Sequence, residues 1–260
     1  MTGIPIGGAL NVSSKRNVAY QDYFVRLRSM YDAQCESMQE YFSRMDQLLA
    51  REIAQERELI EDEIAAHVME DCRIIDEESY EWEGEIYLFG PARFRRLIRR
   101  SNLVTVVTYF ESSLSDIVSA LLQESNARRV GTAPGLRLKD FGPNNVFDRC
   151  HTVLTKYIGI TDDPGLWSRA KDFIKLRNPI VHQAGFVPVV DEKGHYVPEE
   201  KSLKNAYDKL APKGFSLMES GEMIIDPRML DLFLEAVRSY LFDLCSQASD
   251  HFSRPKVVKN

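Results

Sequence analysis

The sequence predicts an all-α fold, a helical bundle with a long N-terminal helix and small β-hairpin insertions. Apolar residues recur at helical spacing over residues 19–69, 93–124 and 226–245, and each of these segments is too long for an ordinary strand. Alternating apolar and polar residues, which indicate strands, are confined to short runs after residue 185. We therefore expect helices to form the core and strands to be local additions.

Length and composition indicate one domain of ordinary size with an extension. The chain has 260 residues, of which 44% are hydrophobic, enough to bury a substantial core. A boundary is expected at Gly90-Pro91, where an acidic stretch ends. The expected parts are a mobile tail, an N-terminal helical extension with an acidic segment, a main helical domain and a basic tail, at 1–18, 19–90, 91–252 and 253–260.

Charge and cysteine content exclude several classes of protein. The formal net charge of −6 argues against nucleic-acid binding through an overall positive field, so an RNA contact needs a local basic patch. The cysteines are far apart and form no Cys-x2-Cys pair, which argues against a zinc site and a disulfide framework. No apolar run approaches membrane length, and the first residues lack a signal-peptide pattern. We expect a soluble cytoplasmic protein without a cofactor or a membrane partner.

The long N-terminal helix carries an approximate heptad seam. The seam consists of Phe24, Leu27, Tyr31, Met38, Tyr41, Met45 and Leu48. Polar Gln34 interrupts it, and beyond Glu52 its phase drifts. Two interpretations are open: a coiled coil that joins two copies of the chain, or a long helix that lies across its own domain.

Five arginines are candidate RNA-binding residues: Arg96, Arg99, Arg100, Arg128 and Arg129. The first three follow a strongly acidic stretch at 52–85, and the last two lie in a Gly- and Pro-containing loop at 126–145. Such a cluster can guide a phosphate backbone. The arginines that follow the acidic stretch can instead form ion pairs with its carboxylates. The number of carboxylates available there favours this second interpretation.

Further helices are expected at 93–124, at 146–158 and over the segment that ends near residue 185. Asn144 or Asn145 can cap the second of these, because an Asn side chain accepts a hydrogen bond from the free amides of a first turn. Asp162 or Asp163 can cap the third, with Pro164 at an early helical position. Two hairpins follow, one at 186–197 and one at 215–225 around Ser220-Gly221.

The third of these helices contains the most informative residues of the chain. Arg177, Asn178 and His182 place a fixed cation, an amide and an imidazole within six residues. Asn178 and His182 are four residues apart and so share a helix face, while Arg177 lies on the neighbouring edge. A forked guanidinium suits a phosphate, and an imidazole suits proton transfer at neutral pH. This combination is suited to RNA cleavage.

The segment resembles the Arg-x4-6-His signature of the HEPN superfamily, whose members are small all-helical domains. A polar residue usually follows the Arg in that family, and here it is Asn178. Three further features agree with the resemblance: the Tyr109-Phe110-Glu111 triplet on an earlier helix, Gly185 shortly after the His, and a hairpin before the last helix. The resemblance covers residues 92–250 in architecture and is sharp at 177–185.

The resemblance implies a metal-independent endoribonuclease, a toxin or anti-phage effector, whose site is shared between the two subunits of a homodimer. His182 would transfer protons, Arg177 would stabilise the transition state, Asn178 would orient the imidazole or bind phosphate, and Glu111 would hold Arg177 by an ion pair. RNA and an antitoxin or regulatory protein are the implied partners. The alternative is a non-catalytic HEPN module that dimerises and binds RNA, nucleotide or another protein.

Pro179 departs from the family pattern, because it lies between the two expected catalytic residues. Proline removes a backbone donor and its ring clashes with the preceding turn. We therefore expect the helix to kink or to lose its regularity at Pro179. This change either brings Arg177 and His182 together or marks a degenerate site.

Overall fold

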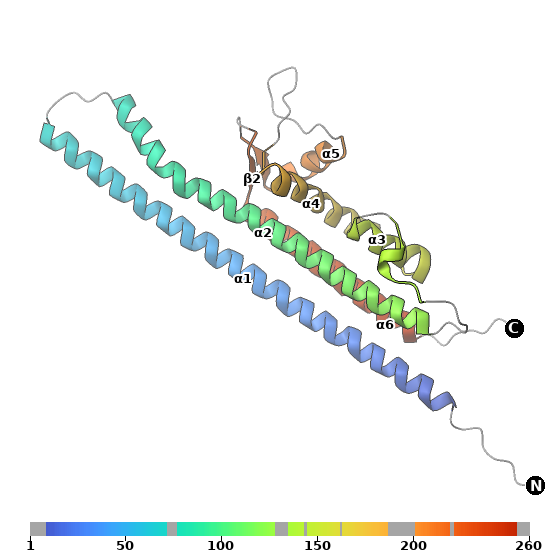
Figure 1. Ribbon diagram of the computed structural model, residues 1–260. Helices are drawn as coiled ribbons and strands as arrows, with labels where there is room; N and C mark the ends of the chain where they lie inside the picture. Colours follow the sequence, from blue (N-terminus) through green and yellow to red (C-terminus); the bar gives the residue numbers. More distant parts are fainter. Residues whose placement is uncertain are drawn as a thin grey trace, which may run out of the picture. The chain divides into compact units, whose positions relative to one another are not determined.

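The computed structural model describes residues 9–71, 77–127, 135–142, 145–161, 163–186, 201–218 and 221–253. The helices are α1 (Ala9–Asp71), α2 (Glu77–Ala127), α3 (Val146–Thr152), α4 (Pro164–His182), α5 (Lys201–Leu210) and α6 (Pro227–Ser253), as Figure 1 shows. Short helical turns are η1 (Leu138–Asp140), η2 (Val153–Ile158, a π-helix) and η3 (Ala211–Lys213). The strands β1 (Phe215–Leu217) and β2 (Met223–Ile225) form a small sheet. The predicted all-α class is confirmed.

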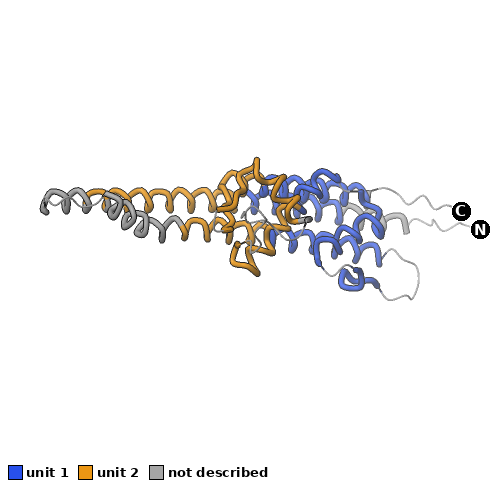
Figure 2. Tube along the Cα trace, turned by 90° about the horizontal axis from the view of Figure 1, so that it is seen from above, with its two compact units in different colours: residues 1–36, 107–171, 233–260 blue, residues 37–106, 172–232 orange. Residues whose placement is uncertain are grey.

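The chain divides into two compact units that are not consecutive in sequence (Figure 2). Unit 1 comprises residues 1–36, 107–171 and 233–260, and unit 2 comprises residues 37–106 and 172–232. Helices α1, α2, α4 and α6 each contribute residues to both units. The division therefore differs from the linear series of tail, extension and domain that the sequence suggested.

Two expected boundaries fall inside helices. Helix α2 runs through Gly90 and Pro91, where the sequence suggested the end of an extension, and helix α1 begins at Ala9, inside the expected mobile tail. Gly and Pro each weaken a helix, but helical sequence on both sides outweighs one such pair. A composition-based boundary is thus not a structural boundary in this chain.

Helix α1 packs on its own chain in each unit. In unit 1 the Tyr31 hydroxyl donates to the Ser113 carbonyl at 3.4 Å, and Arg238 forms an ion pair with Glu36 at 3.0 Å. The Tyr109 hydroxyl donates to the Tyr31 carbonyl at 3.4 Å. These contacts support the interpretation of α1 as a long helix that lies across its own domain.

The buried stripe of α1 differs from the expected seam after Tyr31. Its buried apolar residues are Phe24, Tyr31, Cys35, Phe42 and Leu49. Tyr41 and Leu48, which the heptad pattern placed inside, are 56% and 54% exposed. A straight α-helix has 3.6 residues per turn, so a stripe that repeats every seven residues, or 3.5 per turn, drifts around the helix. A single step of four residues in place of seven offsets this drift. The step from Tyr31 to Cys35 is of that kind.

Aromatic rings form the centre of unit 1. The rings of Phe147 and Trp167 stack with centroids 3.7 Å apart. Phe110 meets both Phe147 and Tyr240 edge-on, each at a centroid distance of 5.4 Å. These four residues come from α3, α4, α2 and α6, and Phe110 is completely buried. The aromatic cluster therefore joins the four helices within this unit.

The core of unit 2 includes helix α5, which the sequence reading did not identify. Its buried side is formed by Ala206, Tyr207 and Leu210, at the helical spacing expected of one face. The Tyr207 ring lies 4.4 Å from that of Phe215, and its hydroxyl donates to the Met223 sulfur at 3.5 Å. Helix α5 therefore covers the β1–β2 hairpin.

The two predicted helix caps are confirmed and resolved to single residues. The Asn145 side chain accepts a hydrogen bond from the Asp148 amide at 2.7 Å at the start of α3. The Asp163 carboxylate accepts from the Gly165 amide at 2.7 Å, and α4 begins at Pro164. Each cap satisfies an amide that has no partner within its own first turn.

The predicted hairpin at 215–225 is also confirmed. β1 and β2 pair in antiparallel register, with Phe215 opposite Ile225. The expected earlier hairpin lies largely outside the described residues, which stop at Phe186 before resuming at Lys201. Phe186 forms an isolated antiparallel bridge with Glu222. The end of α4 is therefore attached to the β1–β2 hairpin.

We expect Asp163→Ala to lower the free energy of unfolding by about 1 kcal/mol, because the first turn of α4 loses its side-chain acceptor. Urea denaturation compares it with Asp163→Ser, which keeps an acceptor oxygen and should remain close to the wild type. An equal loss in both variants would contradict the capping role.

Candidate functional site

The expected catalytic residues lie on the last turns of α4. The side chains of Asn178 and His182 are exposed, and Arg177 is half-buried. Arg177 Nη1 lies 3.5 Å from Asn178 Oδ1, which is the outer limit of a hydrogen bond. Arg177 Nε is buried and has no hydrogen-bond partner among the described residues. The site thus combines an exposed imidazole and amide with a guanidinium that has an unused donor.

Helix geometry separates Arg177 from His182 within one chain. Five residues along a helix correspond to a rotation of about 140° and a rise of about 7.5 Å. Helix α4 continues past Pro179 to His182, so the proline does not end the helix. Asn178 and His182, four residues apart, remain on one face.

The chain leaves α4 through two residues in the left-handed region. Ala184 has φ 52° and Gly185 has φ 81°. The Pro179 carbonyl accepts hydrogen bonds from the amides of Gln183 at 2.9 Å and Gly185 at 3.1 Å, which close the helix end. The Met223 amide then donates to the Gly185 carbonyl at 2.8 Å. The turn after His182 is therefore bonded both to α4 and to β2.

A buried ion pair fixes this turn. Arg100, only 3% exposed, donates to the Ala184 carbonyl at 3.1 Å and to the Glu222 carboxylate at 2.9 Å. Arg96 forms a second ion pair with Glu222 at 3.4 Å. We name Arg96, Arg100, Glu222 and the Ala184 carbonyl the turn network. It holds α2, the end of α4 and the hairpin together.

Gly185 is required by this arrangement for two reasons. A Cβ atom at this position would lie 2.3 Å from Arg100 Nη1 and 2.7 Å from Arg100 Cδ, both closer than real contacts allow. The positive φ of Gly185 also disfavours other residues. The sequence marked Gly185 only through the family resemblance, and the structure gives it a physical role.

The neighbouring arginines of α2 bind a different carboxylate. Arg95 donates two hydrogen bonds to Asp46, at 3.1 and 2.7 Å, and Arg99 donates one at 2.7 Å. Arg96, Arg99 and Arg100, expected as RNA-binding residues, thus have carboxylate partners in unit 2. The partners observed are Asp46 and Glu222. Most side chains of the upstream acidic stretch lie outside the described residues. Arg128 and Arg129 also lie outside them.

Glu111 belongs to unit 1 and Arg177 to unit 2, so their expected ion pair remains a prediction. Within unit 1, burial raises the pKa of the Cys150 thiol to about 12. The charge of Arg149 lowers this pKa, and the charge of Glu111 on α2 raises it further. Its neighbour His151 stacks on Trp167 with centroids 4.1 Å apart. These environments do not suit a thiol dyad.

Other chemistries find little support in the described part of the chain. No group of His, Cys, Asp and Glu side chains suited to a metal ion occurs among the residues searched. Cys35, Cys150 and Cys245 are buried and free, and Cys72 lies outside the described residues. None of the described helices is both long and apolar enough to cross a membrane.

No protein-family model, curated protein or solved structure matches the chain. The sequence drew attention to Arg177, Asn178 and His182 but not to Glu222 or Asp46. Glu222 has Glu219 and Asp226 within four residues, so no local signal distinguished it.

We expect Gly185→Ala to lower the free energy of unfolding by at least about 2 kcal/mol, because Arg100 must move and the backbone is strained. Chemical denaturation measures the loss. Gly142→Ala is the matched control, because a Cβ there meets nothing within 4 Å. Equal stability of the two variants would show that the turn network tolerates displacement.

Acid should weaken unit 2 through Asp46. Burial alone raises the pKa of this carboxyl, but the hydrogen bonds and charges of Arg95 and Arg99 outweigh burial, and the pKa is lowered. A lowered pKa contributes stability above the unfolded value of about 3.9, and that contribution is lost as pH falls through the folded value. Urea denaturation between about pH 5 and pH 3 should therefore show a steeper loss in the wild type than in Asp46→Asn. Parallel pH profiles would contradict this assignment.

Proposed function

We propose that the chain is a metal-independent endoribonuclease whose site is completed by two copies of the chain. The supporting observation is the end of α4, which carries the exposed His182 and Asn178 together with Arg177, whose Nε is buried and has no hydrogen-bond partner among the described residues. Leaving a buried donor unpaired costs about 1–3 kcal/mol. A phosphate binds the guanidinium fork through parallel hydrogen bonds, and it reaches the buried Nε when the Arg177 side chain turns outward.

The roles follow from the chemistry of RNA cleavage. The 2′-oxygen attacks the adjacent phosphorus, a P–O bond forms, and the bond to the 5′-oxygen breaks. His182 of one copy takes the 2′-hydroxyl proton, and a protonated His182 of the second copy gives a proton to the leaving 5′-oxygen. Acid–base help of this kind contributes about 10²–10⁴ in rate. Arg177 stabilises the charge on the phosphorane, and Asn178 binds the phosphate or orients the imidazole.

Two copies are needed because each chain supplies one imidazole at this site and presents Arg177 and His182 in different directions. Val181, next to His182, is 46% exposed, so an apolar side chain accompanies the polar ones on this surface. Packing a second α4 there would bury Val181 and bring a second Arg177 toward His182. Glu111 is proposed, from the HEPN resemblance alone, to orient Arg177.

A second candidate function is a non-catalytic HEPN-like module that dimerises and binds RNA, nucleotide or another protein. The observation that favours it is the pairing of Arg96, Arg99 and Arg100 with Asp46 and Glu222, which leaves less positive charge for a phosphate backbone. For the endoribonuclease, the HEPN resemblance adds a toxin or anti-phage role and an antitoxin or regulatory protein as a partner.

We expect the purified protein to cleave cellular RNA in excess EDTA and to leave 2′,3′-cyclic phosphate and 5′-hydroxyl ends. His182→Ala and Arg177→Ala should each lower the rate at least about 100-fold, since each removes a proton carrier or a charge stabiliser. Gel-resolved cleavage over time measures the rates. His251→Ala, on the exposed end of α6, is the matched histidine control and should keep the wild-type rate.

Equal background cleavage in the wild type and both variants would favour the binding module. Cleavage that stops in EDTA and returns with a divalent metal would reject the proposed mechanism. Circular dichroism of each variant separates loss of catalysis from loss of folding.

A further inference from the structure

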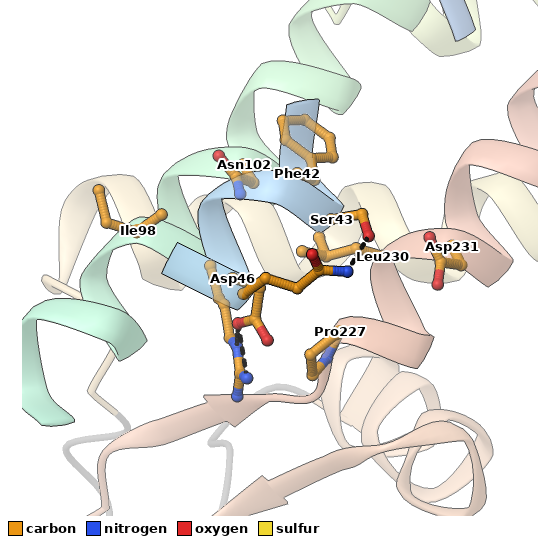
Figure 3. A pocket seen from close by; sticks show the side chains of 10 residues that line it. Phe42, Ser43, Asp46, Ile98, Asn102, Pro227, Leu230 and Asp231 are labelled. Carbon is orange, nitrogen blue, oxygen red and sulfur yellow. Dashed lines mark hydrogen bonds and ion pairs between the residues drawn. The ribbon is translucent and has the colours of Figure 1, made fainter. Parts of the chain in front are cut away.

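A pocket of about 230 Å³ lies in unit 2 between α1, α2 and the start of α6 (Figure 3). It is lined by Phe42, Ser43, Asp46, Gln47, Ile98, Arg99, Asn102, Pro227, Leu230 and Asp231. A neighbouring hollow of about 330 Å³ shares Phe42, Ile98 and Asn102 with it. Neither includes Arg177 or His182, so this pocket is separate from the proposed catalytic residues.

Asn102 is the feature that points to a ligand. Its side chain lines the pocket, and the residue is only 8% exposed. No hydrogen bond joins its carboxamide to another group in the described part of the chain. The amide is thus available to a molecule in the pocket.

The pocket lining includes the cationic side chain of Arg99, which is paired with Asp46. The other polar groups of the lining present mainly acceptors. Asp46 is already occupied by Arg95 and Arg99. The Gln47 amide nitrogen lies 3.5 Å from Ser43 Oγ and donates to it, which leaves its carbonyl oxygen as an acceptor. The remaining acceptors are the Asn102 carbonyl and the Asp231 carboxylate at the exposed rim.

No described Lys or Arg side chain forms an ion pair with the Asp231 carboxylate, which accepts one long bond, from Gln39 at 3.4 Å. Burial raises the pKa of Asp231, the Gln39 bond lowers it, and the nearby Asp226 raises it further. The Asp231 carboxylate therefore attracts a positive charge at this part of the rim.

We propose that this pocket binds a cationic group on a short aliphatic stem, a guanidinium or an ammonium. The stem lies against Phe42, Ile98 and Leu230, and the cationic head donates to the Asp231 carboxylate and to the open amide oxygens. The cation comes either from a free small molecule or from an arginine or lysine side chain of a polypeptide. The proposal is independent of RNA cleavage.

Titration of the ¹⁵N-labelled full chain with n-butylguanidinium and with n-butylammonium tests the proposal by NMR. At least one cation should give saturable shifts at the Asn102 side-chain amide, with a dissociation constant on the order of 1 mM for so small a probe. Asn102→Leu and Asp231→Asn should each weaken binding about tenfold or more, and backbone amides report binding in Asn102→Leu. Asp243→Asn is the matched control, because Asp243 is another α6 carboxylate bonded to a glutamine, at 2.8 Å from Gln247.

A capped arginine, N-acetyl-arginine methylamide, distinguishes the sources. Tighter binding than n-butylguanidinium indicates a polypeptide side chain, and equal or weaker binding indicates a free small molecule. Should Asn102→Leu fail to fold, Asp231→Asn carries the test. Shifts produced by inorganic phosphate but by neither cation, or identical binding to wild type and Asp231→Asn, would overturn the proposal.

Discussion

The buried ion pair between Arg100 and Glu222 is the constraint on which the geometry of the candidate catalytic site depends. Charges this deep are costly unless hydrogen bonds satisfy them, and removing one partner typically costs about 3–5 kcal/mol. Here the Ala184 carbonyl and Arg96 add further bonds to the pair, although Arg100 Nε is buried and has no hydrogen-bond partner among the described residues. Because Ala184 lies two residues after His182, the same bonds that satisfy the ion pair fix the chain next to the imidazole.

The carboxylate partners explain the spacing of the arginines on α2. Arg95 and Arg99 are four residues apart and bond Asp46, while Arg96 and Arg100 are four residues apart and bond Glu222. Residues at this spacing share a helix face, so α2 presents two rows of guanidinium groups, each directed at one carboxylate. The cluster that suggested a phosphate track thus has a structural role within unit 2, and RNA must displace or supplement these pairs to use it.

Local signals in the sequence predicted local structure well. The caps Asn145 and Asp163 and the antiparallel hairpin at 215–225 depend on neighbouring residues, and each is present. The phase of the α1 stripe, with Phe42 rather than Tyr41 buried, depends on packing that no short window contains. The observed partners of Arg96, Arg99 and Arg100 lie more than forty residues away in sequence, so charge counting favoured pairing but did not identify Asp46 or Glu222.

The central claim is that Arg177 and His182 act across two copies of the chain. Mixing wild-type with His182→Ala chains after joint unfolding and refolding tests it most directly, with RNA cleavage in EDTA as the readout. A shared site that needs His182 from both copies predicts that activity falls as the square of the wild-type fraction, because every mixed dimer lacks one imidazole. Activity that falls in direct proportion to the wild-type fraction would contradict a shared site.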